Sequence, residues 1–247
     1  MPEQLSPSGS SDAAGFAATH WTIVLSAARG SETPRASAAM AELCRTYWYP
    51  LYAYVRRRNY DAHEAEDLTQ EFFVRLIAKN YLAEVDRQKG KFRAFLLAAM
   101  KHFLTNEWHR SQAQKRGGGE MIISLDTNSA ENRYRLEPSH NLTPERLFER
   151  QWILTVLDRV LVVLQAELAV EGKQAIFDGL KQFLTAERRS ANYAQVAGDL
   201  GMTEGAVKTA AHRLRRRYRE LLRQEIAQTV ASPEEIDEEI GYLLSCL

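Results

Sequence analysis

Cysteine is nearly absent from this sequence, which holds only Cys44 and Cys246 among its 247 residues. Two thiols cannot form the disulfide framework of a small secreted domain, and their scarcity fits a reducing compartment. Net charge is absent too, because 32 lysines and arginines balance 32 aspartates and glutamates. This balance argues against a nucleic-acid partner only if the charge is spread evenly along the chain.

Long apolar runs are also missing. Residues 1–15 are small and polar, without the basic start and apolar core of a secretory signal. The most apolar stretch, residues 152–164, is interrupted by Asp158 and Arg159 and is too short and too charged to span a bilayer. We therefore expect a soluble, cytoplasmic protein without a membrane segment.

Residue sets typical of catalysis or metal binding are lacking as well. The six histidines form no H-E-x-x-H motif, and the cysteines form no ligand pair. The glycines at 117–119 lack the Gly-Lys-Ser/Thr ending of a phosphate-binding loop, which favours a hinge. No Ser/His/Asp set can be identified, because such groups meet only in three dimensions. We expect no enzyme activity, no cofactor and no metal.

Apolar residues, by contrast, make up 45% of the chain and recur at helical spacing nearly everywhere. Alternating strand patterns are almost absent, with one short extended piece at 121–125, so we predict an all-α protein. A first helix is expected from about Thr19 to Gly30. The predicted organisation is a disordered tail (1–15), a helical domain (16–115), a flexible linker (116–142), a second helical domain containing a helix-turn-helix (143–228) and an acidic tail (229–247).

Several helix ends can be predicted from capping residues. Asp61 and Glu64 have the spacing of a capping box. Thr143 followed by Pro144 combines an N-cap with a proline in the first turn. Pro50 falls inside the helix that begins near residue 34, where it should kink or split that helix.

Charge is not spread evenly, and it forms four blocks. Residues 61–71 hold five acids and no base, and residues 231–247 again hold five acids and no base. Residues 85–116 hold eight lysines and arginines against two acids, and residues 205–225 hold seven against two. One such block is usually a solvated helix face. Two basic blocks in two helical units could both supply contacts to phosphates.

The strongest local motif lies within residues 192–217, where two short helical patterns meet at Gly201. Glycine allows the left-handed conformation of a tight turn, and Thr203 can cap the second helix. Val207, Ala210 or Ala211, and Leu214 are expected to pack against the first helix. The residues expected to point outward favour a DNA-binding helix in a major groove over an ordinary helical hairpin with a basic outer face. They are Glu204, Gly205, Lys208, Thr209, His212, Arg213 and Arg216.

The order of acidic helix, basic aromatic helix, linker and helix-turn-helix resembles the sigma-70 family of bacterial RNA polymerase sigma factors, and most closely its small extracytoplasmic-function (ECF) group. The first matching motif is Ala65-Glu-Asp-Leu-Thr-Gln-Glu-Phe-Phe73. The resemblance implies that this helix docks on core RNA polymerase. An acidic rim around apolar residues suits a partner that is basic and partly apolar. The residues implied are Glu66, Asp67, Leu68, Gln70, Glu71, Phe72 and Phe73.

The second motif begins at Phe92-Arg93-Ala-Phe95-Leu and continues to residue 116. It is similar to the family segment that recognises and opens the −10 promoter element. Exposed aromatic rings beside a basic groove can hold unstacked bases. Phe92, Phe95 and Phe103 are expected in the core, which leaves Trp108 for DNA. The implied DNA-contacting residues are Arg93, Lys101, Asn106, Trp108, Arg110, Lys115 and Arg116.

The third motif, the helix-turn-helix, resembles the reader of the −35 promoter element. Ala210 stands where many members have arginine, so other cations are expected to make the contacts. The residues implied are Thr203, Glu204, Gly205, Lys208, Thr209, His212, Arg213, Arg215 and Arg216.

The predicted function is therefore a sigma factor that directs transcription initiation, with core RNA polymerase and promoter DNA as partners and an anti-sigma protein as a possible further one. Two alternatives remain open: a helix-turn-helix regulator that works without polymerase, and a helical scaffold whose basic faces meet acidic proteins. The acidic tail carries apolar residues at helical spacing, including Ile236 and Leu243. We expect it either to pack back on the protein or to restrain access to DNA.

Overall fold

The structure, a computed structural model, describes residues 34–78, 90–113, 127–137, 142–185 and 192–247. All regular structure in these ranges is helical, which confirms the all-α prediction. The helix predicted at residues 19–30 and the extended piece at 121–125 lie outside them. The elements are α2 (Pro34–Arg57), α3 (Ala62–Ala78), α4 (Phe92–Ala113), α5 (Thr127–Arg135), α6 (Pro144–Val170), α7 (Gln174–Leu180), α8 (Gln182–Thr185), α9 (Tyr193–Leu200), α10 (Glu204–Ala227), the short 3-10 helix η3 (Pro233–Glu235) and α11 (Ile236–Leu244).

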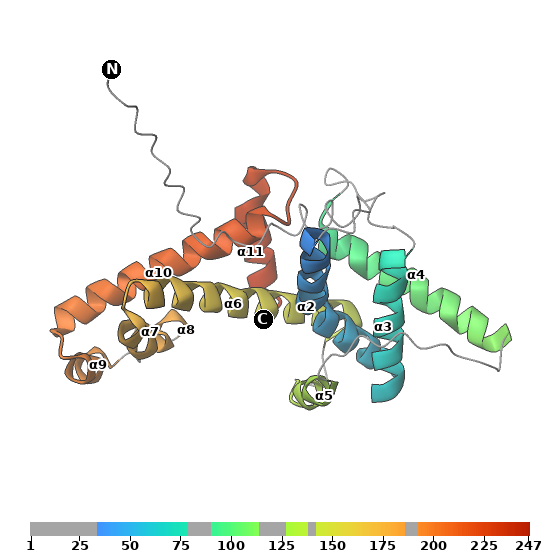
Figure 1. The fold of residues 1–247 in the computed structure, drawn as a ribbon, viewed down its shortest axis with the longest axis horizontal. Helices are drawn as coiled ribbons and strands as arrows, with labels where there is room; N and C mark the ends of the chain where they lie inside the picture. Colours follow the sequence, from blue (N-terminus) through green and yellow to red (C-terminus); the bar gives the residue numbers. More distant parts are fainter. Residues whose placement is uncertain (1–33, 79–89, 114–126, 138–141, 186–191) are drawn as a thin grey trace, which may run out of the picture.

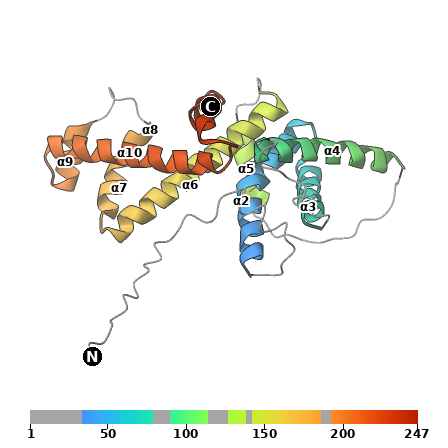
Figure 2. The same ribbon diagram turned by 90° about the horizontal axis from the view of Figure 1, so that it is seen from above.

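Helix α6 is the central element of the arrangement (Figure 1). Helices α2 to α5 gather around one end of it, and α7 to α10 gather around the other end (Figures 1 and 2). The most extensive packing between any two elements joins α6 to α2, and α6 also packs against α10 and α7. One long helix thus connects the two groups.

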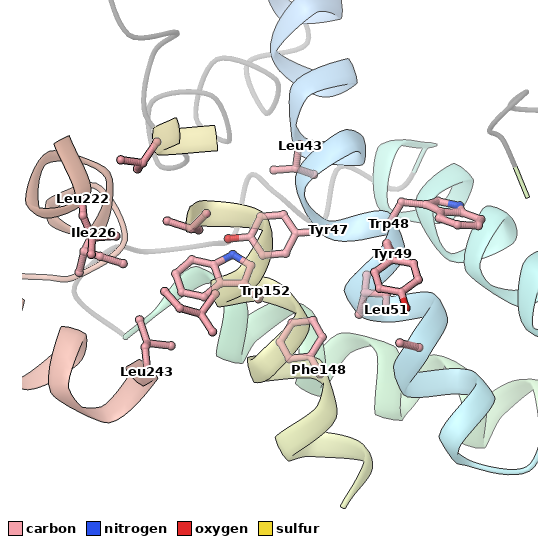
Figure 3. Close-up of a cluster of buried hydrophobic side chains, with 14 of the residues drawn as sticks. Leu43, Tyr47, Trp48, Tyr49, Leu51, Phe148, Trp152, Leu222, Ile226 and Leu243 are labelled. Carbon is pink, nitrogen blue, oxygen red and sulfur yellow. The ribbon is translucent and has the colours of Figure 1, made fainter. Parts of the chain in front are cut away.

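A single apolar core lies where α2, α6, α10 and α11 meet (Figure 3). Tyr47 of α2 and Trp152 of α6 are fully buried and stack with ring centroids 6.4 Å apart. Ile226 of α10 and Leu243 of α11 are equally buried beside them. Burial of such large side chains is the main source of folding free energy. The described residues of the two predicted helical domains therefore share one core.

The prediction of a flexible linker is wrong for residues 127–135, because they form helix α5. Ala130 of this helix is buried, and the Glu131 carboxylate accepts hydrogen bonds from Tyr52 and Arg56 of α2. Contacts with α2 therefore stabilise a short helix whose own sequence has little apolar periodicity.

The predicted helix ends are largely confirmed. Asp61 accepts a hydrogen bond from the Glu64 amide, and Glu64 accepts one from the Asp61 amide, which completes a capping box. Thr143 caps α6 by accepting from the Arg146 amide. Pro50 does not split α2, which is continuous from Pro34 to Arg57.

The acidic C-terminal segment packs back on the protein, which was one of the two outcomes expected for it. Ile236 and Leu243 of α11 are buried, and α11 contacts both α6 and α10. Among the described residues, no helix is long and apolar enough to cross a bilayer. The same ranges contain no group of three or more His, Cys, Asp or Glu side chains placed to hold a metal ion.

Candidate functional site

Helix α3 lies in the group of helices at one end of α6 (Figure 1), and several of its accessible residues are acidic. Asp67 is exposed and pairs with His63 at 3.0 Å, and Glu71 pairs with Arg75 at 2.7 Å. Glu66 is half-buried, and burial, followed by the neighbouring Asp67 charge, raises the pKa of its carboxyl. We call a set of partly or fully exposed residues in the middle of this helix the acidic face: Glu66, Asp67, Leu68, Gln70 and Glu71.

Phe72 and Phe73, predicted to face a protein partner, are instead core residues. Their side chains are 4% and 1% exposed, and Phe72 packs edge-on against Phe103 of α4 with ring centroids 5.7 Å apart. The sequence prediction is corrected because both rings are buried in the core, and Phe72 lies on the side of α3 that faces α4. They stabilise the helix that carries the acidic face and form no part of its surface.

A groove with a volume of about 270 Å³ lies between α3 and α4. Aromatic and aliphatic side chains make up most of its lining, and the half-buried Phe95 is one of them. Polar groups at the groove come from Arg75, His102 and Asn106. An apolar floor with a few polar groups above it can hold a flat, partly polar ring. Asn106 was predicted to contact DNA, whereas Arg75, His102 and Phe95 were not.

The predicted DNA-contacting residues of α4 differ in their accessibility. Trp108 is 54% exposed and lies edge-on to His109, with ring centroids 5.0 Å apart. Lys101 pairs with Glu145 at the start of α6, at 2.8 Å. The Arg110 side chain, Lys115 and Arg116 lie outside the described residues.

Arg93 does not fit the prediction. Its side chain is 3% exposed, it pairs with Glu239 of α11, and its guanidinium lies 5.1 Å from the centre of the Trp152 ring. The sequence prediction of an exposed cation is corrected for this structure, because the C-terminal segment covers Arg93. It cannot contact DNA while α11 stays in place.

Helices α9 and α10 meet at the tight turn that the sequence predicts. Gly201 is left-handed, with φ 63° and ψ 30°, and ends α9. Asn192 caps α9 and Thr203 caps α10, each by accepting a backbone amide hydrogen bond. Val207, Ala211 and Leu214 are buried, which resolves the choice between Ala210 and Ala211. The local sequence therefore determines both helix ends at this turn.

The outer side of α10 is polar, with the exposed cations Lys208, Arg213 and Arg216 along it. Lys208 pairs with Glu204 at 2.6 Å, and Arg216 pairs with Glu220 at 2.9 Å. Such exposed pairs are weak and exchange readily for a phosphate contact. The exposed residues, which we call the recognition face, are Glu204, Gly205, Lys208, Thr209, His212, Arg213 and Arg216.

Arg215 is not part of this face, contrary to the prediction. Its Nε donates to the Phe183 carbonyl at 2.8 Å, and its other nitrogens donate to the Tyr193 hydroxyl. The side chain is held against α8 and α9 because residue 215 lies on the side of α10 that faces them. It supports the packing of α10 and does not point outward.

Known proteins show similarity over much of this chain. Residues 43–114, which hold most of α2 and all of α3 and α4, match the sigma-70 region 2 family. The chain is also similar to the ECF RNA polymerase sigma factor SigE of Mycolicibacterium smegmatis, with 25% identity over 193 residues. That alignment covers 77% of this chain and 64% of the relative, so the chain matches less than two thirds of the relative's length. No solved structure gives a significant match.

Proposed function

We propose that the chain is a sigma-70 family sigma factor of the ECF group, as its region 2 match and its similarity to an ECF sigma factor support, and that it directs promoter-specific initiation by bacterial core RNA polymerase. One observation carries the proposal. The acidic face of α3 and the recognition face of α10 belong to groups of helices at opposite ends of α6 (Figures 1 and 2). A protein and a DNA duplex can therefore be bound at the same time.

Core polymerase binds the acidic face in this proposal. The Asp67 side chain is 64% exposed and that of its partner His63 is 85% exposed, so a basic surface can replace that pair with little loss. The half-buried Leu68 adds apolar area beside the carboxylates. Phe72 and Phe73 act indirectly, since both are buried and hold α3 in the core, with Phe72 packed on Phe103 of α4.

The −10 element binds along α4. Trp108 offers an exposed ring on which a base can stack, and the groove between α3 and α4 can accept another flat ring. Asn106 and His102 supply hydrogen-bonding groups at that groove. This arrangement supports the holding of unstacked bases, which strand opening requires.

The −35 element binds α10 as duplex. Lys208, His212 and Arg213 are spaced along the exposed side of the helix. Their spacing allows the start of α10 to lie in a major groove, with flanking cations on phosphates. The Arg215 anchor and the capped turn at Gly201 hold the helix at a fixed angle to α9.

The chain makes no phosphodiester bonds in this proposal, because core polymerase carries that chemistry. An anti-sigma protein is a further possible partner. It would compete with polymerase for the acidic face or with DNA for the recognition face.

Run-off transcription is the direct test. Core polymerase is incubated with the purified chain on a library of genomic fragments, and new transcripts are mapped. We expect initiation at a set of sites that share two sequence elements. If no fragment supports initiation above the level of core polymerase alone, the proposal is wrong.

Variants then locate the two surfaces. Asp67→Ala should weaken binding to core polymerase about 3- to 10-fold and reduce its salt dependence, because a charge at an interface acts mainly on association. Asp158→Ala removes an exposed carboxylate from α6 and is the matched control. Equal binding by both variants would contradict the docking assignment.

A regulator that binds DNA without polymerase is the alternative, since the recognition face needs no second protein. Replacing Lys208 and Arg213 with alanine should lower the salt slope of duplex binding by about 1.8, or about 0.9 for each lost phosphate contact. Lys173→Ala, at the exposed turn after α6, is the control. Tight operator binding without any effect of Asp67→Ala on transcription would favour the regulator.

A further inference from the structure

The C-terminal segment bridges the two groups of helices. Helix α11 packs against α6 and α10, and at the same time it reaches the first residues of α4. Asp237 pairs with Arg223 of α10, and Tyr242 donates a hydrogen bond to Glu149 of α6. Leu247 also joins the contact, since the Arg150 Nε donates to its carbonyl at 3.5 Å. One short segment therefore contacts three helices.

Glu239 is the centre of this contact. Its carboxylate is fully buried and accepts hydrogen bonds from both Lys91 and Arg93 at the start of α4. Glu149 lies 3.8 Å from the Arg93 guanidinium, and the Tyr242 ring lies within 6 Å of both cations. Two cations thus face two carboxylates in a site closed to solvent on the Glu239 side.

These two cations belong to the basic block that the −10 assignment uses. Residues 85–116 carry eight bases against two acids, and residues 231–247 carry five acids and no base. A DNA phosphate and the Glu239 carboxylate present the same kind of acceptor to Lys91 and Arg93. While Glu239 holds them, Arg93 is only 3% exposed and cannot reach a phosphate, and the positive charge of the 35% exposed Lys91 is already offset by a carboxylate.

We propose that residues 231–247 form an autoinhibitory latch, in which Glu239 takes the place of a DNA phosphate on Lys91 and Arg93 and holds the start of α4 against α6 and α10. The inference rests on the proposed function only in treating α4 as a helix that contacts DNA. Release of the latch frees Lys91 and Arg93 at the start of α4, the helix that carries Trp108 and forms one side of the groove with α3.

The chemistry of the site makes the latch reversible. A buried ion pair gains attraction but loses the hydration of both partners, so its net stabilisation is small. A nucleic-acid strand offers several phosphates at once and releases counterions when it binds. DNA at sufficient concentration can therefore displace the single carboxylate of Glu239.

The test compares Glu239→Gln with Glu238→Gln in the full-length chain. Both substitutions remove one carboxylate from α11, but Glu238 is exposed and Glu239 is buried on α4. The probe is a fluorescein-labelled, random-sequence single-stranded DNA 30-mer, and the readout is fluorescence anisotropy across a salt series. We expect Glu239→Gln to bind about 3- to 10-fold more tightly than Glu238→Gln. Its salt slope should be steeper by about 1.4, as expected for two further cations on single-stranded DNA.

Circular dichroism and thermal melting show whether each variant is folded. If Glu239→Gln is folded and its DNA affinity lies within twofold of Glu238→Gln, the latch is overturned. If Glu239→Gln does not fold, Tyr242→Phe decides the question, because it removes only the hydrogen bond to Glu149 and keeps the ring over the two cations. Tyr242→Phe should then bind DNA about twofold more tightly than wild type, and unchanged affinity would overturn the latch.

The same experiment separates the latch from the proposed function, because the DNA probe requires no polymerase. A wild-type chain that fails to bind core polymerase overturns the proposed function, while tighter DNA binding by Glu239→Gln still supports the latch. A wild-type chain that starts transcription, together with unchanged DNA affinity in Glu239→Gln, overturns the latch alone.

Discussion

Tyr47 and Trp152 lie 105 positions apart in the numbering and stack at an interplanar angle of 20°, with both side chains completely buried. One ring comes from the segment that matches the sigma-70 region 2 family and the other from α6, outside that segment. A core built from both groups of helices requires them to fold together. We therefore expect the described helices to unfold as one cooperative unit.

Trp152→Ala is expected to destabilise the whole chain by about 3–5 kcal/mol, because it removes a large buried ring and leaves a cavity. Urea unfolding followed by far-UV circular dichroism gives the free energy, and tryptophan fluorescence gives a second probe. Val162→Ala, on the same helix but 65% exposed, should cost less than about 0.5 kcal/mol. Two separate transitions in the wild type would contradict the shared core.

The contact between Arg56 and Glu131 should make stability depend on pH. Burial acts to raise the pKa of Glu131, but hydrogen bonds from Arg56 and Tyr52 outweigh it and lower the pKa below the usual 4.5. A lowered folded pKa gives stability that is present above pH 4.5 and is lost as the pH falls through the folded value. Glu131→Gln should cost about 1–3 kcal/mol at pH 7, since these hydrogen bonds involve charged groups.

The difference between wild type and Glu131→Gln should then shrink as the pH falls from 5 to 3, measured by urea unfolding at each pH. Asp158→Asn provides the comparison for an exposed carboxylate. A difference that stays constant over this range would show that the ion pair does not link α5 to α2.

Helix ends were predictable from the sequence because their determinants are local. The Asp61–Glu64 capping box, the Thr143 cap and the left-handed Gly201 each depend on residues within one helical turn. Helix α5 was missed because its stabilising partner, Arg56, is 75 positions from Glu131. No local pattern signals such a contact.

In the candidate site, too, features set by nearby residues were predictable, and features set by distant contacts were not. Most of the recognition face was predictable, since the period of α10 and the position of the turn determine which residues point outward. The burial of Arg93 was not, because Glu239 lies 146 positions away. Phe72 and Phe73 were predicted to be interface residues because the resemblance placed the whole motif at an interface, whereas both rings are buried and Phe72 packs on Phe103 of α4.

Gly201→Ala should destabilise the turn between α9 and α10 by about 1 kcal/mol, because an alanine at φ 63° is strained even where its Cβ has space. Gly198→Ala is a matched control three residues earlier. It also adds a Cβ with no atom within 4 Å, but in helical backbone, so it should stabilise α9 by about 0.5–1 kcal/mol. Thermal melting of both variants measures the difference, and a melting temperature of Gly201→Ala at or above that of Gly198→Ala would rule out the strained turn.

Trp108→Ala should weaken single-stranded DNA binding by about 1–3 kcal/mol without changing stability, because a 54% exposed ring stacks on a base and contributes little to the core.

Trp48→Ala is the control, with the opposite pattern expected. Trp48 is buried and stacks on Tyr52 with ring centroids 5.2 Å apart, so its loss should lower the melting temperature. At temperatures where it is still folded, Trp48→Ala should bind DNA as the wild type does. Anisotropy titrations with the random-sequence 30-mer, combined with melting curves, separate the two effects. Equal DNA affinity of Trp108→Ala and wild type would remove Trp108 from the proposed −10 surface and leave the groove between α3 and α4 as the remaining base-binding candidate.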